Sequence, residues 1–162
     1  MIRQAHINAV YCCHRKPRDK QVSIILPQHG TRFGANANFG YAQFNAHVNF
    51  DNAILPDTLS FYNIEPKKEI DFTHAKLDSG KQQCVIELIG TNLSKLKLNY
   101  ELFKLYLPRI VTRTEEGELI YQPYEFKIYE ALLERFKELG DTKSYNLLDK
   151  EYKYFKEHED DE

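Results

Sequence analysis

Between positions 37 and 55 the sequence ANFGYAQFNAHVNFDNAIL places a large apolar residue at every fifth or sixth position. These residues are Phe39, Phe44, Phe50 and Leu55, and Ala or Val stands two places before each of them. An α-helix brings residues three and four apart to one face, and a β-strand brings alternate residues to one face, so this step fits neither. The segment therefore predicts a solenoid, in which each short stretch turns a corner and sends one large side chain inward.

The same spacing occurs in two blocks of the chain. The first block contains TRFGA, ANFGY, AQFNA, VNFDN and AILPD, and the second contains IDFTH, AKLDS, TNLSK, LKLNY and ELFKL. The centres of these segments are the predicted core residues: Phe33, Phe39, Phe44, Phe50, Leu55, Phe72, Leu77, Leu93, Leu98 and Phe103. A narrow interior must place small side chains beside large ones, and the Ala residues before many of the centres fit that requirement.

This pattern resembles the pentapeptide-repeat family, whose motif is a small residue, Asp or Asn, Leu or Phe, a small polar residue and a variable one. The resemblance covers roughly residues 31–107. It implies a mainly β fold, a right-handed quadrilateral β-helix with four five-residue faces in each coil. At about 20 residues per coil, the range would form roughly four coils.

The sequence departs from the family motif in several places. Gln43, Lys76 and Leu102 stand where Asp or Asn is usual. Residues 60–69 and 80–90 do not fit the motif, and we expect them to be loops or a looser coil.

Residues 1–30 form a basic segment in front of the repeats. Residues 1–32 carry six Lys or Arg against one acidic residue, whereas residues 108–162 carry nine against fifteen. The stretch HRKPRDK is predicted to be a solvated loop, and QVSIILP a strand that can cap the first coil. So few basic side chains support only weak phosphate contacts, and direct binding of nucleic acid is not expected.

Residues 108–123 are predicted to be a linker, in which TEEGELIYQP forms a loop or a short hairpin. Residues 124–162 are predicted to form an α-helical hairpin with an acidic tail. Apolar residues recur at intervals of three and four over residues 124–139, which is typical of an amphipathic helix. Gly140 is the expected end of this helix, and either of the next two residues can cap a second one.

No motif in the sequence predicts catalysis, and we expect no enzyme, small-molecule substrate, cofactor or metal. The chain lacks GxGxxG, GxxxxGK[ST] and GxSxG motifs. Cys12, Cys13 and His14 have no second pair of ligands with zinc-site spacing. Three cysteines without a framework spacing fit a reducing cytoplasm. No apolar run is long enough to span a membrane, and the N-terminus does not resemble a signal peptide.

Three functional hypotheses follow. The first is a non-catalytic module that binds or scaffolds an unidentified protein partner, through the solenoid or through the helices. The second rests on the family resemblance, because its best understood members imitate duplex DNA and modulate type II topoisomerases. The third is an accessory to a membrane protein, because similar repeat and hairpin segments can precede membrane spans in longer bacterial chains. The sequence leaves the oligomeric state open.

Overall fold

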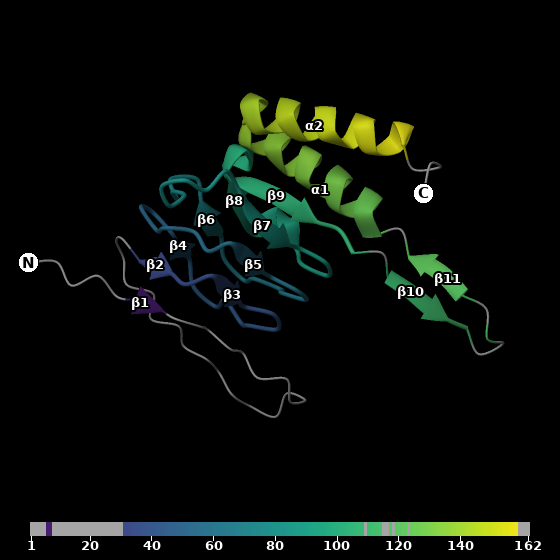
Figure 1. Cartoon of the computed structure of the whole chain (residues 1–162), viewed down its shortest axis with the longest axis horizontal. Coiled ribbons are helices and arrows are strands. Elements are labelled where there is room, and N and C mark those ends of the chain that lie inside the picture. The colour runs from purple at the N-terminus through teal and green to yellow at the C-terminus, as the bar shows by residue number, and fades with distance from the viewer. Residues whose placement is uncertain are drawn as a thin grey trace, which may run out of the picture. The chain divides into compact units, whose positions relative to one another are not determined.

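The structure is a computed structural model that describes residues 6–7, 31–108, 110–114, 117, 119–122 and 124–158. The chain divides into two compact units, Met1–Leu105 and Tyr106–Glu162. The first contains short strands and two 3-10 helices, and the second a strand pair and two α-helices (Figure 1). The solenoid elements are β1 (His6–Ile7), β2 (Arg32–Phe33), β3 (Asn36–Asn38), β4 (Val48–Asn49), β5 (Thr58–Ser60), β6 (Ile70–Phe72), β7 (Cys84–Glu87), η1 (Leu93–Lys95), β8 (Leu96–Leu98), η2 (Tyr100–Leu102) and β9 (Phe103–Tyr106).

Strands of successive coils stack into parallel ladders. One sheet has the order β3-β5-β7-β9, and a second has the order β4-β6-β8. A third ladder joins β1 to β2 and continues through parallel bridges at Ile54 and Lys76. Such stacking makes the chain a parallel-strand β-solenoid of about three turns, which confirms the predicted solenoid fold.

The coils are longer than the repeat motif predicted. Strand β3 meets β5 with Asn36 opposite Thr58, a step of 22 positions along the chain. The next step in this ladder is longer still, because Ser60 of β5 lies opposite Glu87 of β7, 27 positions further on. Longer coils reduce the predicted four coils to about three turns.

Two segments that do not fit the repeat motif are nevertheless parts of the coils. Strand β7 lies inside residues 80–90 and pairs with β5, so this segment is not a loop. Within residues 60–69 the chain continues the wall after β5, because Phe61 N donates to Glu87 O at 2.9 Å. Of the two predicted alternatives, loops or a looser coil, the structure shows the coil, which is longer here because 27 positions separate Ser60 from Glu87. Backbone pairing between coils tolerates side chains outside the motif.

Apolar side chains fill the interior. Nine of the ten predicted repeat centres are buried, and Leu77 is half-buried. The Phe39 ring stacks on Phe61 with centroids 5.3 Å apart, and Phe50 stacks on Phe72 at 4.1 Å. Each ring therefore covers the ring one coil away. The core also contains buried residues that the motif did not single out: Leu59, Phe61, Ile64, Ile70, Ile86 and Leu88.

The Asp or Asn before many centres forms a local turn. Asn38, Asn49 and Asp71 each accept a hydrogen bond from the backbone N–H two residues further on, at 2.7 to 2.8 Å. Asn92, before the centre Leu93, caps η1 in the same way, and Asn99, which follows the centre Leu98, caps η2. Short polar side chains of this kind satisfy backbone donors where the chain leaves a strand. This explains why the motif favours Asp or Asn at that position.

The second unit begins with an antiparallel pair, β10 (Ile110–Arg113) and β11 (Leu119–Gln122). The two strands occupy half of residues 108–123, so the predicted linker contains an antiparallel strand pair, in keeping with the short hairpin that was one of the two predicted alternatives. Helices α1 (Tyr124–Leu139) and α2 (Thr142–Glu157) follow, as the apolar periodicity predicted.

The helical boundaries have local causes. Gly140 has a left-handed φ of 68°, which suits the residue that follows a helix. Asp141 caps α2, since its side chain accepts a hydrogen bond from Ser144 N at 3.0 Å. A mainly β solenoid followed by a helical hairpin is therefore the observed fold class.

Candidate interaction surfaces

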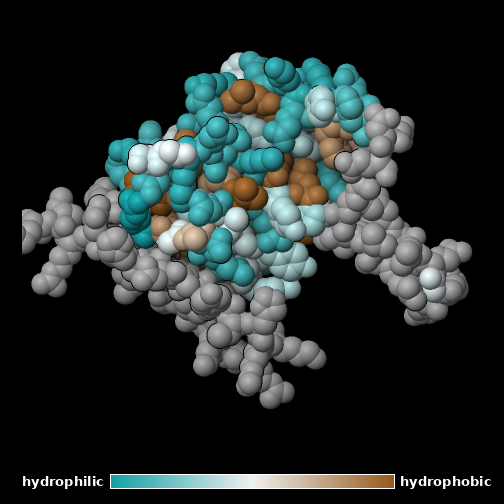
Figure 2. Space-filling model, viewed as in Figure 1, coloured by the Kyte–Doolittle hydropathy of each residue, from teal (hydrophilic) through white to brown (hydrophobic). Residues whose placement is uncertain are grey.

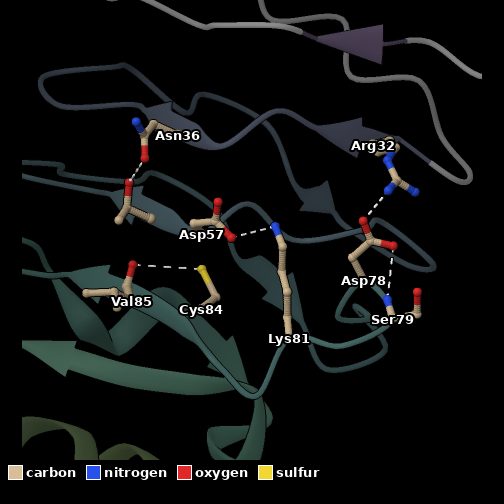
Figure 3. Close-up of polar contacts among 9 residues, drawn as sticks. Arg32, Asn36, Asp57, Asp78, Ser79, Lys81, Cys84 and Val85 are labelled. Carbon is tan, nitrogen blue, oxygen red and sulfur yellow. Dashed lines mark hydrogen bonds and ion pairs between the residues drawn. The ribbon is translucent and has the colours of Figure 1, made fainter.

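Outward polar side chains of the solenoid pair across coils (Figure 3). Lys81 Nζ lies 2.6 Å from a carboxylate oxygen of Asp57, and Arg32 forms an ion pair with Asp78. Thr58 donates a hydrogen bond to Asn36. These contacts add side-chain links to the backbone ladders between coils.

More acidic side chains are engaged in the same manner. Lys97 pairs with Glu69 at 3.0 Å, and Asn92 donates to Glu65 at 2.7 Å. His74 Nδ1 lies 3.1 Å from Asp51. Among the described residues, several lysines take part in no ion pair: Lys67, Lys68, Lys76, Lys95 and Lys104. The described surface of the solenoid therefore mixes acidic side chains with lysines that take part in no ion pair.

The Asn92-Leu93-Ser94 tripeptide spells a glycosylation sequon, but the Asn92 side chain takes part in three hydrogen bonds within the chain. Its Nδ2 donates to Glu65, and its Oδ1 accepts from the Ser94 backbone N–H at 3.1 Å and from the Ser94 hydroxyl at 2.8 Å. A structural capping role accounts for this residue.

Cys84 is fully buried at the start of β7, where its thiol lies 3.8 Å from Val85 O (Figure 3). Burial raises the pKa of the thiol to about 12, so the thiol stays protonated at neutral pH. Cys12, Cys13 and His14 lie outside the described residues. Within the described part of the chain, no group of three or more His, Cys, Asp or Glu could hold a metal ion. The same part contains no helix long and apolar enough to cross a membrane.

Aromatic residues join the two helices of the hairpin. The Tyr129 and Tyr152 rings stack with centroids 4.8 Å apart, and Phe155 packs against Tyr129 at 5.5 Å. The hydroxyls bond reciprocally: Tyr129 donates to Glu151 at 2.9 Å, and Tyr152 donates to Glu130 at 3.1 Å. Burial, followed by the charge of Glu151, raises the pKa of Tyr129. The rings are thus packed and their polar ends satisfied.

Helix α2 also carries apolar side chains that point to solvent. Leu147 is 41% exposed, and Tyr154, two turns further on, is 65% exposed and stacks on His158 at 4.1 Å. We call these three residues the α2 stripe. A shallow open groove lies near the turn between the helices, lined by Leu133, Glu134, Lys137, Glu138 and Tyr145.

Hydrophilic residues cover most of the described surface in Figure 2, and apolar residues occur there in small areas. Among the described residues, three aromatic side chains are exposed and can be tested individually: Tyr41, Tyr106 and Tyr154. On the solenoid the most exposed of them is Tyr41, at 63%.

Fold and surface together define a β-solenoid repeat protein with a C-terminal helical hairpin. No protein-family model, curated protein or solved structure matches the chain. The assignment to the class of β-solenoid repeat proteins therefore rests on the fold of this chain alone.

Proposed function

We propose that the chain is a non-catalytic protein-binding or scaffolding module. The observation that carries this proposal is that the aromatic and charged side chains of the solenoid contact one another from coil to coil. Phenyl rings fill the solenoid interior, and ionic side chains such as Lys81 and Asp57 link one coil to the next. These contacts between coils make the solenoid rigid and hold its outward side chains in fixed positions. A rigid surface favours recognition of a partner, because little conformational entropy is lost on binding.

Two surfaces can serve this function. The α2 stripe offers apolar and aromatic side chains on a helix whose other face is already occupied by the Tyr129–Tyr152 contact. The solenoid offers exposed Tyr41. Exposed tyrosines are frequent anchors in protein interfaces, because a rigid ring covers much area and loses little entropy on binding.

Charge argues against a DNA mimic as the leading function. Asp57, Glu69 and Asp78 are each within ion-pair distance of Lys or Arg, so these three carboxylates add little unpaired negative charge to the solenoid surface. No observation specifically favours an accessory role for a membrane protein. Both remain secondary hypotheses.

The test is affinity capture with the full chain and two surface variants. One variant carries Leu147→Glu and Tyr154→Glu in the α2 stripe, and the other carries Tyr41→Asn on the solenoid. We expect wild type to retain a partner in stoichiometric amount, and at least one variant to lose it. A matched control, Lys104→Glu, changes an exposed residue outside both surfaces.

The result would contradict the proposal if wild type retained no protein, or if both variants retained every protein that wild type retains. Topoisomerase subunits retained by wild type would instead support DNA mimicry. Turnover of a substrate by the purified chain would contradict the non-catalytic assignment.

A further inference from the structure

One corner of the solenoid repeats a left-handed backbone conformation in successive coils. Tyr41, Asn63 and Gly90 have φ values of 61°, 52° and 71°. Tyr41 N donates to Tyr62 O, and Asn63 N donates to Ile89 O, each at 2.9 Å, which places the three residues at equivalent positions of neighbouring coils. Gly and Asn are the usual residues for this conformation, whereas a bulky Tyr is disfavoured there.

Burial of the side chain does not offset the disfavoured backbone conformation of Tyr41. Its side chain is 63% exposed, although its ring edge contacts Tyr62 with centroids 5.5 Å apart at 75°. Asn63 Nδ2 donates to the Tyr41 hydroxyl at 3.3 Å. The chain thus holds an exposed ring in a fixed orientation on a disfavoured backbone, a combination that is frequent at functional sites.

Gly90 is part of this arrangement. A Cβ atom at Gly90 would lie 1.9 Å from Asn63 Oδ1. Because Gly90 has no side chain, the Asn63 side-chain oxygen can lie against residue 90. In this position the Asn63 Nδ2 reaches the Tyr41 hydroxyl. Three coils contribute to the placement of one exposed ring.

One carboxylate belongs to the same corner. Glu87 lies opposite Ser60 in the β5–β7 ladder, two residues before Tyr62, and accepts a hydrogen bond from the Ser60 hydroxyl at 2.5 Å. It is not ion-paired with a Lys or Arg of the described chain. Burial is the main cause that raises the pKa of Tyr62, with smaller contributions from Tyr41 and from the charge of Glu87. The Glu87 charge therefore acts on the Tyr62 ring.

We propose that this aromatic corner, formed by Tyr41, Tyr62, Asn63 and Glu87, is the docking point for an arginine side chain of a partner protein. A guanidinium can stack on a tyrosine ring and pair with a nearby carboxylate, and arginine does this better than lysine. The inference deepens the proposed function and rests on it, because it names the chemistry that the solenoid recognises in a partner.

The test uses the full chain with ¹³C-labelled tyrosine rings and three synthetic peptides. The first is Gly-Ser-Arg repeated four times, and the others replace each Arg with Lys or with Glu. We expect the arginine peptide to shift the Tyr41 and Tyr62 resonances, the lysine peptide to bind more weakly, and the glutamate peptide to leave both unchanged. Tyr41→Asn should weaken binding about three- to tenfold, the size of one cation–π contact.

Two further variants separate recognition from structure. Glu87→Gln keeps an acceptor for Ser60 and removes the charge, so it should also weaken binding of the arginine peptide. Glu157→Gln removes an exposed carboxylate at the end of α2, outside the α2 stripe, and should bind the peptide as wild type does. Because Asn suits a left-handed backbone, Tyr41→Asn should melt at the wild-type temperature or above it.

The proposal is overturned if the arginine peptide moves neither resonance, if the glutamate peptide moves them equally, or if Tyr41→Asn binds the arginine peptide with wild-type affinity. It is also overturned if Tyr41→Asn lowers the melting temperature, since the ring would then have a structural role. If wild type still retains a partner in the capture experiment, protein binding stands and only this docking point is wrong. If capture fails as well, both proposals fall.

Discussion

The solenoid and the helical hairpin bury aromatic rings in different ways. In the solenoid, phenyl rings without polar atoms stack on the ring of the next coil, as Phe50 does on Phe72. In the hairpin, Tyr129 and Tyr152 stack between two helices and send their hydroxyls to glutamates at the edge of the contact. The hairpin buries phenylalanine as well, at Phe136, so the difference lies in the tyrosine pair, whose hydroxyls need acceptors where they end.

The two regions also differ in how far their stabilising contacts reach along the chain. Ladder hydrogen bonds of the solenoid join one coil to the next, as where Phe50 N donates to Asp71 O at 2.9 Å, so a strand satisfies its backbone only against its neighbours. Each helix of the hairpin forms its hydrogen bonds within itself. A destabilising substitution in the solenoid should therefore also lower the stability of neighbouring coils. A destabilising substitution in the hairpin should have a more local effect.

The largest effect should come from Phe72→Ala. The Phe72 ring is fully buried and contacts Phe50, Phe61 and Phe103 at centroid distances of 4.1, 5.7 and 5.9 Å. Removing it should lower the free energy of unfolding by about 3 to 5 kcal/mol, measured by urea denaturation. Tyr154→Ala, at an exposed ring of α2, is the matched control and should change stability by less than about 0.5 kcal/mol. If both variants lost the same free energy of unfolding, the buried Phe72 ring would contribute no more to stability than an exposed ring of the hairpin.

A pair of glycine variants tests whether the coil corners are specified by side chains of the next coil. Gly90→Ala places a methyl group against Asn63 on a left-handed backbone, and should cost about 2 to 4 kcal/mol. Gly80 is also left-handed, with φ of 87°, but a Cβ there meets nothing within 4 Å. Gly80→Ala should therefore cost only about 1 kcal/mol in the same denaturation experiment. Similar costs for the two would mean that Asn63 moves aside freely.

Sequence reasoning recovered the solenoid because a step of five is compatible with neither a helix nor a single strand. It overlooked Phe61, which follows β5 in a segment without the repeat motif. A different signal points to that residue: Phe61 follows Phe39 at the same interval at which Phe72 follows Phe50. A search for self-similarity at the length of a whole coil, rather than of one face, would have found it.

The hairpin was easier to predict, since its signals are local. Apolar periodicity and Gly140 define α1, and Asp141 defines the start of α2. The candidate surface at Tyr41 was not predictable. Its exposure and backbone conformation depend on where the corners of a whole coil fall, and on Gly90 two coils away, and neither is encoded in residues near Tyr41.

A substitution at the N-cap of α2 should destabilise the hairpin alone. Asp141→Ala removes the acceptor for Ser144 N and should reduce the stability of α2 by about 1 to 2 kcal/mol. Amide hydrogen exchange followed by mass spectrometry should show faster exchange in residues 142–157 and unchanged exchange in the solenoid strands. Asp141→Asn, which keeps a capping oxygen, is the control and should exchange as wild type does. Faster exchange throughout the solenoid would show that the two regions unfold as one cooperative unit.

The smallest effect concerns the pH dependence contributed by Cys84 in the solenoid. Its thiol has a pKa of about 12 in the folded chain against an ordinary value of 9.0, because burial disfavours the thiolate. Above pH 9 the unfolded chain releases this proton while the folded chain keeps it, so the stabilising contribution is present below pH 9 and is lost as pH rises towards 12. Between pH 9 and pH 10 wild type should lose about 1 kcal/mol more than Cys84→Ala.

Urea denaturation of both proteins at the two pH values measures that difference, and groups other than Cys84 cancel in the comparison. Reaction of the native chain with a thiol reagent at pH 8 gives an independent check, since a buried protonated thiol should react only after unfolding. Equal pH dependence of the two proteins, together with rapid reaction of Cys84 in the native state, would mean that the β5–β7 wall opens to solvent. The solenoid would then share the local opening that we expect only of the hairpin.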